Sequence, residues 1–210
     1  MKRKLLPTAA VLVAAAGLIA GCATMLSDAE VSKQALQMMK SSFKANGQAG
    51  LDRLNQDEVQ ATCSQYETQA KVPPEVARRI EQGQLLTVRY PADGKLLGDW
   101  KAGEALAQSG VGKQYNDDPS RPSGGNCYAC HQLSPQELAF GTIGPSLLGY
   151  GKQRGYSEEI RKYTFAKIYN SQAFAACSTM PRFGHNGILT TQQIKDAVAL
   201  LLDPESPVNK

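Results

Sequence analysis

The sequence predicts an all-α protein, and three observations support that fold class. Apolar residues recur at helical spacing in several segments, cap residues and prolines bound those segments, and no region is rich in strand patterns. The one extended candidate, residues 85–90, is short enough to be a strand or a linker. With 210 residues, 42% of them hydrophobic, the chain is long enough for one domain with an extension.

Residues 22–95 are expected to form a small helical N-terminal extension. An amphipathic helix is predicted over residues 27–43, with apolar positions at Val31, Ala35, Met38, Met39 and Phe43. Because Met38 and Met39 lie on that stripe, we expect them to be core methionines. A second helix is predicted over residues 55–69, and a short third helix follows Pro73-Pro74 and reaches Gln82.

A second domain, residues 96–204, is predicted to begin after the turn Pro91-Ala92-Asp93-Gly94, which places the boundary near residue 95. It opens with a helix over residues 99–108 and continues through a polar loop, residues 116–125. The last helix starts at an N-cap, Thr190, with Gln193 three residues later as in a capping box. Its apolar positions are Ile194, Val198, Leu201 and Leu202, and Asp203-Pro204 ends it.

Residues 1–21 have the pattern of a secretory signal peptide. Three bases, Lys2, Arg3 and Lys4, precede an apolar run that is too short for a membrane span, which needs roughly 20 strongly apolar residues. The run ends in Ile19-Ala20-Gly21-Cys22, which resembles a bacterial lipobox. We therefore expect a periplasmic protein with a lipid anchor on Cys22. The alternative is ordinary cleavage nearby, for instance after Ala23.

The mature chain gives no support to several other classes of function. Without the leader it carries 20 Lys and Arg against 19 Asp and Glu, a net charge of +1, so we expect no nucleic-acid partner. The sequence also has no Gly-rich phosphate loop and no nucleophile elbow of the kind that hydrolases use.

The pentapeptide Cys127-Tyr128-Ala129-Cys130-His131 predicts one covalently attached haem c. Its spacing lets both thiols add to the haem vinyl groups while the imidazole of His131 reaches the iron. A zinc site would need a second ligand pair, which the remaining cysteines and histidine do not provide. A redox dithiol would sit in a βαβ context that this helical sequence lacks.

Two further positions are expected to complete the iron site. A ligand histidine needs an acceptor for its second N–H, and the carbonyl of Pro145 or a neighbour is the candidate. Met180, in the irregular segment Ser178 to Gly184, is expected to be the sixth ligand. The competitor for that place is His185, which we interpret mainly as an exposed turn residue. A closed His131/Met180 site argues against oxygen or peroxide chemistry, and no residue of this chain is expected to be catalytic.

Two cysteines, Cys63 and Cys177, remain after Cys22, Cys127 and Cys130 are assigned. In an oxidising compartment such leftover thiols favour a disulfide, which would join the N-terminal extension to the segment that carries Met180. The alternative is two separate buried cysteines.

The arrangement resembles SoxX, the monohaem subunit of the SoxAX thiosulfate-oxidising cytochromes. The similar segments are residues 126–131, 141–151, 178–183 and 189–194, and they span most of residues 97–203. The resemblance implies a class I cytochrome c fold and a heterodimer with a SoxA-like subunit. In that complex the partner would couple thiosulfate to the cysteine of a SoxYZ-like carrier, and this chain would pass the electrons to a small soluble cytochrome c.

Two other functions share the same haem residues. The first is a free-standing electron carrier of another respiratory chain. The second is a ligand-binding or peroxidatic cytochrome in which Met180 does not bind and the iron stays open.

Overall fold

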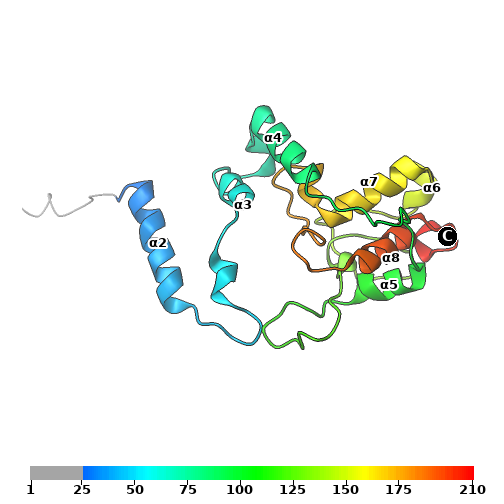
Figure 1. Cartoon of the computed structure of the whole chain (residues 1–210), viewed down its shortest axis with the longest axis horizontal. Coiled ribbons are helices and arrows are strands. Elements are labelled where there is room, and N and C mark those ends of the chain that lie inside the picture. Colours follow the sequence, from blue (N-terminus) through cyan, green and yellow to red (C-terminus); the bar gives the residue numbers. More distant parts are fainter. Residues whose placement is uncertain (1–25) are drawn as a thin grey trace, which may run out of the picture. The chain divides into compact units, whose positions relative to one another are not determined.

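The computed structural model describes residues 26–210 of the chain, so the signal peptide and Cys22 lie outside the described residues. The described part contains seven α-helices and five 3₁₀ turns but no β-strand, which confirms the all-α fold class (Figure 1). Leu85 is the last residue of a helix, Pro74–Leu85, and residues 86–90 form a connection, so this segment is not a strand. None of the helices among residues 26–210 is both long enough and apolar enough to span a membrane.

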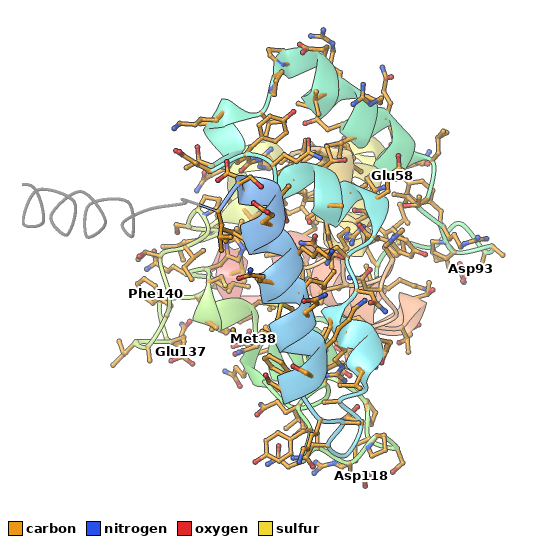
Figure 2. All side chains as sticks on the ribbon, turned by 90° about the vertical axis from the view of Figure 1, so that its left-hand side faces the viewer. Met38, Glu58, Asp93, Asp118, Glu137 and Phe140 are labelled. Carbon is orange, nitrogen blue, oxygen red and sulfur yellow. A yellow bond between two sulfur atoms is a disulfide. The ribbon has the colours of Figure 1, made fainter. Side chains whose placement is uncertain are left out.

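The chain divides into two units, residues 1–43 and residues 44–210. In the first unit, α2 (Asp28–Ser42) starts at the N-cap Ser27, which forms a capping box with Glu30. This helix confirms the one predicted over residues 27–43. None of its side chains is buried, and Met38 is 68% exposed, so the expectation of core methionines is wrong (Figure 2). Helical spacing predicts an apolar face but not what covers it.

The second unit holds the other six helices. They are α3 (Glu58–Cys63), α4 (Pro74–Leu85), α5 (Trp100–Gln108), α6 (Tyr150–Arg154), α7 (Glu158–Tyr169) and α8 (Thr191–Leu202). Short 3₁₀ turns lie at Leu51–Leu54, Gln69–Lys71, Cys127–Ala129, Ser171–Ala173 and Pro207–Asn209. Residues 44–95 belong to the same compact unit as residues 96–210, and the boundary near residue 95 stays a prediction.

The helix predicted over residues 55–69 is shorter than expected, because α3 ends at Cys63. At its end the hydroxyl groups of Thr62 and Ser64 donate to the carbonyl oxygens of Glu58 and Gln60. Such local side-chain bonds compete with continued helix. The chain then passes through turns to Gln69–Lys71 before Pro73 and Pro74 start α4.

The core of the second unit is centred on the packing of α5 against α8 (Figure 1). The helices approach closely at Gly103, where a Cβ atom would lie 2.2 Å from the carbonyl oxygen of Asp196. α8 begins with the predicted capping box of Thr190 and Gln193 and buries all four predicted apolar positions, Ile194, Val198, Leu201 and Leu202. Phe165 of α7 and Leu133, which follows the cysteine motif, belong to the same core.

Candidate functional site

The cysteine motif forms a tight, hydrogen-bonded helical turn. Asn126, in the left-handed conformation with φ 47°, precedes the 3₁₀ turn Cys127–Ala129. The backbone N–H groups of Cys130 and His131 both donate to the carbonyl oxygen of Cys127, at 3.1 and 2.9 Å. The two cysteines and His131 thus lie within a single turn of the chain that these backbone bonds close.

The imidazole of His131 is oriented by its hydrogen bond. Its Nδ1 atom lies 2.7 Å from the carbonyl oxygen of Pro145, which confirms the predicted partner. Because a carbonyl oxygen can only accept, Nδ1 is the donor of this bond. The bond leaves Nε2 as the ring nitrogen that could bind a metal.

A loop folds back onto the cysteine turn and packs against the ring. The N–H groups of Gly141, Gly144 and Leu147 donate to the carbonyl oxygens of Tyr128, Cys130 and Gln132, each at 2.8 Å. At Gly144 an added Cβ atom would lie 2.1 Å from Cε1 of His131, so the backbone rests directly on the imidazole. Only a residue without a side chain allows that approach.

The thiols of Cys127 and Cys130 are free, whereas Cys63 and Cys177 form a disulfide, which confirms the predicted pairing. Burial raises the pKa of Cys127 to about 12. A redox-active dithiol needs the opposite, a lowered pKa that yields thiolate. Within residues 26–210 no group of three or more His, Cys, Asp and Glu side chains could hold a metal ion, which gives no support to a zinc site.

Met180 lies in an irregular segment, as predicted, and not on a helix. Its side chain is half-buried and packs against the hydrophobic core that Cys127 also contacts. Its backbone is held on both sides, because its N–H donates to Ser178 Oγ and its carbonyl oxygen accepts from the hydroxyl of Ser171. The competing residue, His185, is an exposed turn residue whose Nδ1 lies 3.2 Å from Thr87 Oγ1.

Three large apolar side chains are exposed on the loop between His131 and Pro145. They are Leu138, Phe140 and Ile143, with exposed fractions of 89%, 38% and 77%. Figure 2 shows Phe140 and Glu137 at the edge of the molecule on this loop. Contiguous exposed apolar surface marks ligand or partner sites, and these three side chains share one loop that follows the cysteine turn. The donor set and its apolar neighbours thus fit a haem: two free thiols, an imidazole with a free Nε2, and a thioether.

Two features of the site were not predicted from the sequence. The Tyr128 hydroxyl lies 3.0 Å from Oε1 of Glu104 and 2.9 Å from Oγ of Ser134, which anchors the cysteine turn to α5. Burial raises the pKa of Tyr128 to about 12 and raises that of Glu104. Beside this network lies a cavity of about 400 Å³. Its lining includes Tyr128 and Glu137 but none of the predicted iron or thioether ligands.

The second unpredicted feature is an ion pair next to Met180. The guanidinium group of Arg182 is almost fully buried, and it pairs with the carboxylate of Asp57 from the N-cap of α3. Burial raises the pKa of Asp57, but the hydrogen bond from Arg182 and the Gln60 amide outweigh it, so the net pKa is lowered. No sequence signal links the pair, because the partners lie 125 residues apart.

Residues 26–210 therefore define an all-helical protein with a Cys-x-x-Cys-His turn, a histidine whose Nδ1 is bonded to a backbone carbonyl, and one disulfide. No protein-family model matches the chain. An uncharacterized lipoprotein of Aquifex aeolicus (strain VF5) is 44% identical over 158 residues, which cover 74% of this chain and 73% of the relative. The chain belongs to the same family as this lipoprotein.

Proposed function

We propose that the protein is a c-type cytochrome that holds one covalent haem and transfers single electrons. The observation that carries the proposal is the turn Cys127–His131, which presents two free thiols beside an imidazole whose Nδ1–H is already bonded to Pro145. Cys127 and Cys130 would form the two thioether bonds, and His131 and Met180 would be the iron ligands. Haem bound in this way supplies a one-electron couple, and a methionine ligand raises its reduction potential.

The protein's own groups would orient and protect the bound haem. Pro145 accepts the hydrogen bond from Nδ1 of His131, and the missing side chain at Gly144 lets the loop backbone pack against the ring. The exposed apolar side chains of Leu138, Phe140 and Ile143 would gain burial against an apolar macrocycle. We propose that residues 96–204 form the class I cytochrome c domain, with the packed pair α5 and α8 as its frame.

The finer proposal is that the chain is the SoxX-like subunit of a thiosulfate-oxidising complex. It rests on the resemblance of residues 178–183 and 189–194 to that family. In the structure the second of these segments starts α8, and Gln193 Nε2 donates to the carbonyl oxygen of Ser123, just before the cysteine turn. The partners would be a SoxA-like subunit, a SoxYZ-like carrier protein and a small soluble cytochrome c.

We further propose that the mature protein is anchored to the membrane by lipid on Cys22 and faces the periplasm. The lipobox-like sequence Ile19-Ala20-Gly21-Cys22 supports this, and so does the description of the Aquifex aeolicus relative as a lipoprotein.

Stopped-flow mixing with thiosulfate tests the complex. The purified, oxidised protein alone should not be reduced, because it offers no reactive thiol and its iron is closed. With the cognate SoxA-like subunit and a cysteine-bearing carrier it should be reduced rapidly. A carrier whose cysteine is replaced by serine is the control and should give no reduction. Rapid reduction of the isolated chain would contradict the subunit proposal and favour an independent redox enzyme.

A further inference from the structure

Two segments that lie far apart in the sequence are joined by many contacts. We name residues 57–87 the brace segment and residues 170–185 the ligand segment, because the latter carries Met180. Besides the disulfide, hydrogen bonds and one ion pair join the two segments. Gln69 and Glu81 bond to the backbone of Ala176, and Gln84 and Thr87 bond to the side chain of Asn170. Arg182 bonds to Gln84 and pairs with Asp57, and His185 Nδ1 bonds to Thr87 Oγ1. The brace segment therefore holds the ligand segment on both sides of Met180.

The only covalent link between these two segments in the described structure is the disulfide of Cys63 and Cys177. Cys177 has a φ of 58°, in the left-handed region that non-glycine residues rarely adopt. Such a conformation persists only where surrounding structure imposes it. Here the constraints are the disulfide itself and the bonds of Gln69 and Glu81 to the neighbouring Ala176.

The disulfide lies at a surface depression of about 350 Å³. The other lining side chains are all polar and uncharged: Gln56, Gln60, Ser64, Gln172 and Ser178. Among them, Gln172 is buried and its Oε1 atom has no hydrogen-bond partner. A depression of this size and polarity admits a small polar thiol, and access of this kind controls the rate of thiol–disulfide exchange.

We infer that the Cys63–Cys177 disulfide is a thiol-reactive latch that holds Met180 in its ligand position and releases it when small thiols open the bond. The inference rests on the proposed role of Met180 as iron ligand. With the bond open, the left-handed turn at Cys177 loses its covalent constraint three residues before Met180. The remaining contacts are hydrogen bonds and one ion pair, so the ligand segment gains freedom.

The exchange reaction balances without any other oxidant. The thiolate of one small thiol attacks a sulfur of the disulfide, so the protein S–S bond breaks and a mixed disulfide forms while one cysteine leaves as a thiolate. The thiolate of a second small thiol attacks the mixed disulfide at the small-thiol sulfur, forms the disulfide of the two small thiols and releases the other cysteine as a thiolate. Two electrons pass from two small thiols to the protein disulfide, and the released thiolates take protons from solvent.

The test opens the bond in the folded, haem-loaded protein with glutathione. The new thiols are capped by alkylation, intact mass counts them, and the iron is then oxidised with ferricyanide. We expect two alkyl groups per chain, loss of the weak charge-transfer band of methionine-ligated ferric iron, and carbon monoxide binding after reduction of the iron. Amide hydrogen exchange over residues 177–183 should rise about tenfold, since local opening becomes easier.

Two variants serve as comparisons. The double variant Cys63→Ser/Cys177→Ser should match the reduced protein, and Ser64→Ala, which changes the same depression but keeps the bond, should match the untreated one. A disulfide that resists glutathione, or an opened one with an unchanged band and unchanged exchange, would overturn the latch. If the untreated protein already lacks the band, the ligand role of Met180 has failed. In that case hydrogen exchange still decides whether the bond restrains residues 177–183.

Discussion

The Nδ1 atom of His131 lies 2.7 Å from the carbonyl oxygen of Pro145, fourteen residues further along the chain. The acceptor is a backbone carbonyl, so it cannot titrate or change its tautomer. The bond therefore orients the ring and its Nε2 atom through the backbone alone. Gly144, which precedes the acceptor residue, has its backbone against the ring and so connects the position of the loop to the angle of the ligand.

Gly144→Ala should lower the fraction of protein that carries covalent haem. The new Cβ would meet the imidazole at 2.1 Å, so the ring or the loop must move and the bond to Pro145 would be strained. Gly83→Ala is the matched control, because a Cβ there meets nothing within 4 Å. The measurement is haem absorbance per protein mass after secretion. Equal loading of both variants and the parent would show that the approach of Gly144 to the ring is unimportant.

Met180→Ala should leave the haem attached, because the thioether bonds do not involve the sixth ligand. The reduction potential should fall, since a thioether favours ferrous iron, and the ferrous protein should bind carbon monoxide. Met39→Ala on the exposed helix α2 is the control and should behave as the parent. Potentiometric titration and carbon monoxide spectra check this. An unchanged potential would move the sixth ligand to His185 or a lysine.

Asp57→Asn should reduce stability in a pH-dependent way. The carboxylate pairs with the buried guanidinium of Arg182, and we expect a loss of about 1–2 kcal/mol near neutral pH. Removing one partner of a fully buried ion pair costs about 3–5 kcal/mol of stability, and the smaller value here follows from the partial exposure of Asp57.

The stability that Asp57 contributes should depend on pH, because its pKa is lowered in the folded protein. The contribution is present above the ordinary pKa of 3.8 and disappears as the pH falls through the lowered pKa. Urea unfolding of parent and variant across that range measures the difference, which should shrink in acid. A constant difference at all pH values would contradict the ion-pair account.

Local signals in the sequence were sufficient for several elements. The capping box of Thr190 and Gln193 and the apolar stripe behind it predict α8 correctly, because a cap and a helical period are properties of a few neighbouring residues. The Cys63–Cys177 bridge followed from counting cysteines in an oxidising compartment. The Pro145 acceptor followed from the rule that a histidine which binds a metal through one nitrogen needs a hydrogen-bond acceptor for the other N–H.

Other elements depend on contacts that no local pattern contains. Helix α7 was not predicted, because its buried residues Thr164, Phe165, Ala166 and Ile168 mix polar and apolar types and give no clean apolar stripe. The Arg182–Asp57 pair joins two polar residues that a sequence reading would place on the surface. Amphipathic spacing predicted helix α2 correctly, but it did not predict that the apolar face of this helix is exposed.

Thr190→Ala should destabilise the protein by about 1 kcal/mol, the usual effect of removing an N-cap side chain. The hydroxyl of Thr190 accepts from the Gln193 N–H at the start of α8, which carries much of the core. Thr191→Ala is the control, because Thr191 is exposed in the first turn and alanine is a better helix former. Denaturant unfolding of both variants checks the difference. Equal stability of the two variants would argue that the capping box contributes little.

Cys22→Ala should release the mature protein from the membrane fraction, because the variant has no thiol to carry lipid. Cell fractionation with detergent partitioning provides the measurement. The haem content should stay at the parent level, since Cys127 and Cys130 are unaffected. A variant that remains in the membrane fraction would refute the anchor on Cys22.

The proposed function depends above all on covalent haem at Cys127 and Cys130, which intact mass spectrometry of the secreted, acid-denatured protein measures. We expect a mass increase of one haem per chain, a pyridine haemochrome spectrum of the c type, and no alkylation at Cys127 or Cys130. An unmodified polypeptide mass with both thiols open to alkylation, or haem that leaves on denaturation, would rule out a c-type cytochrome.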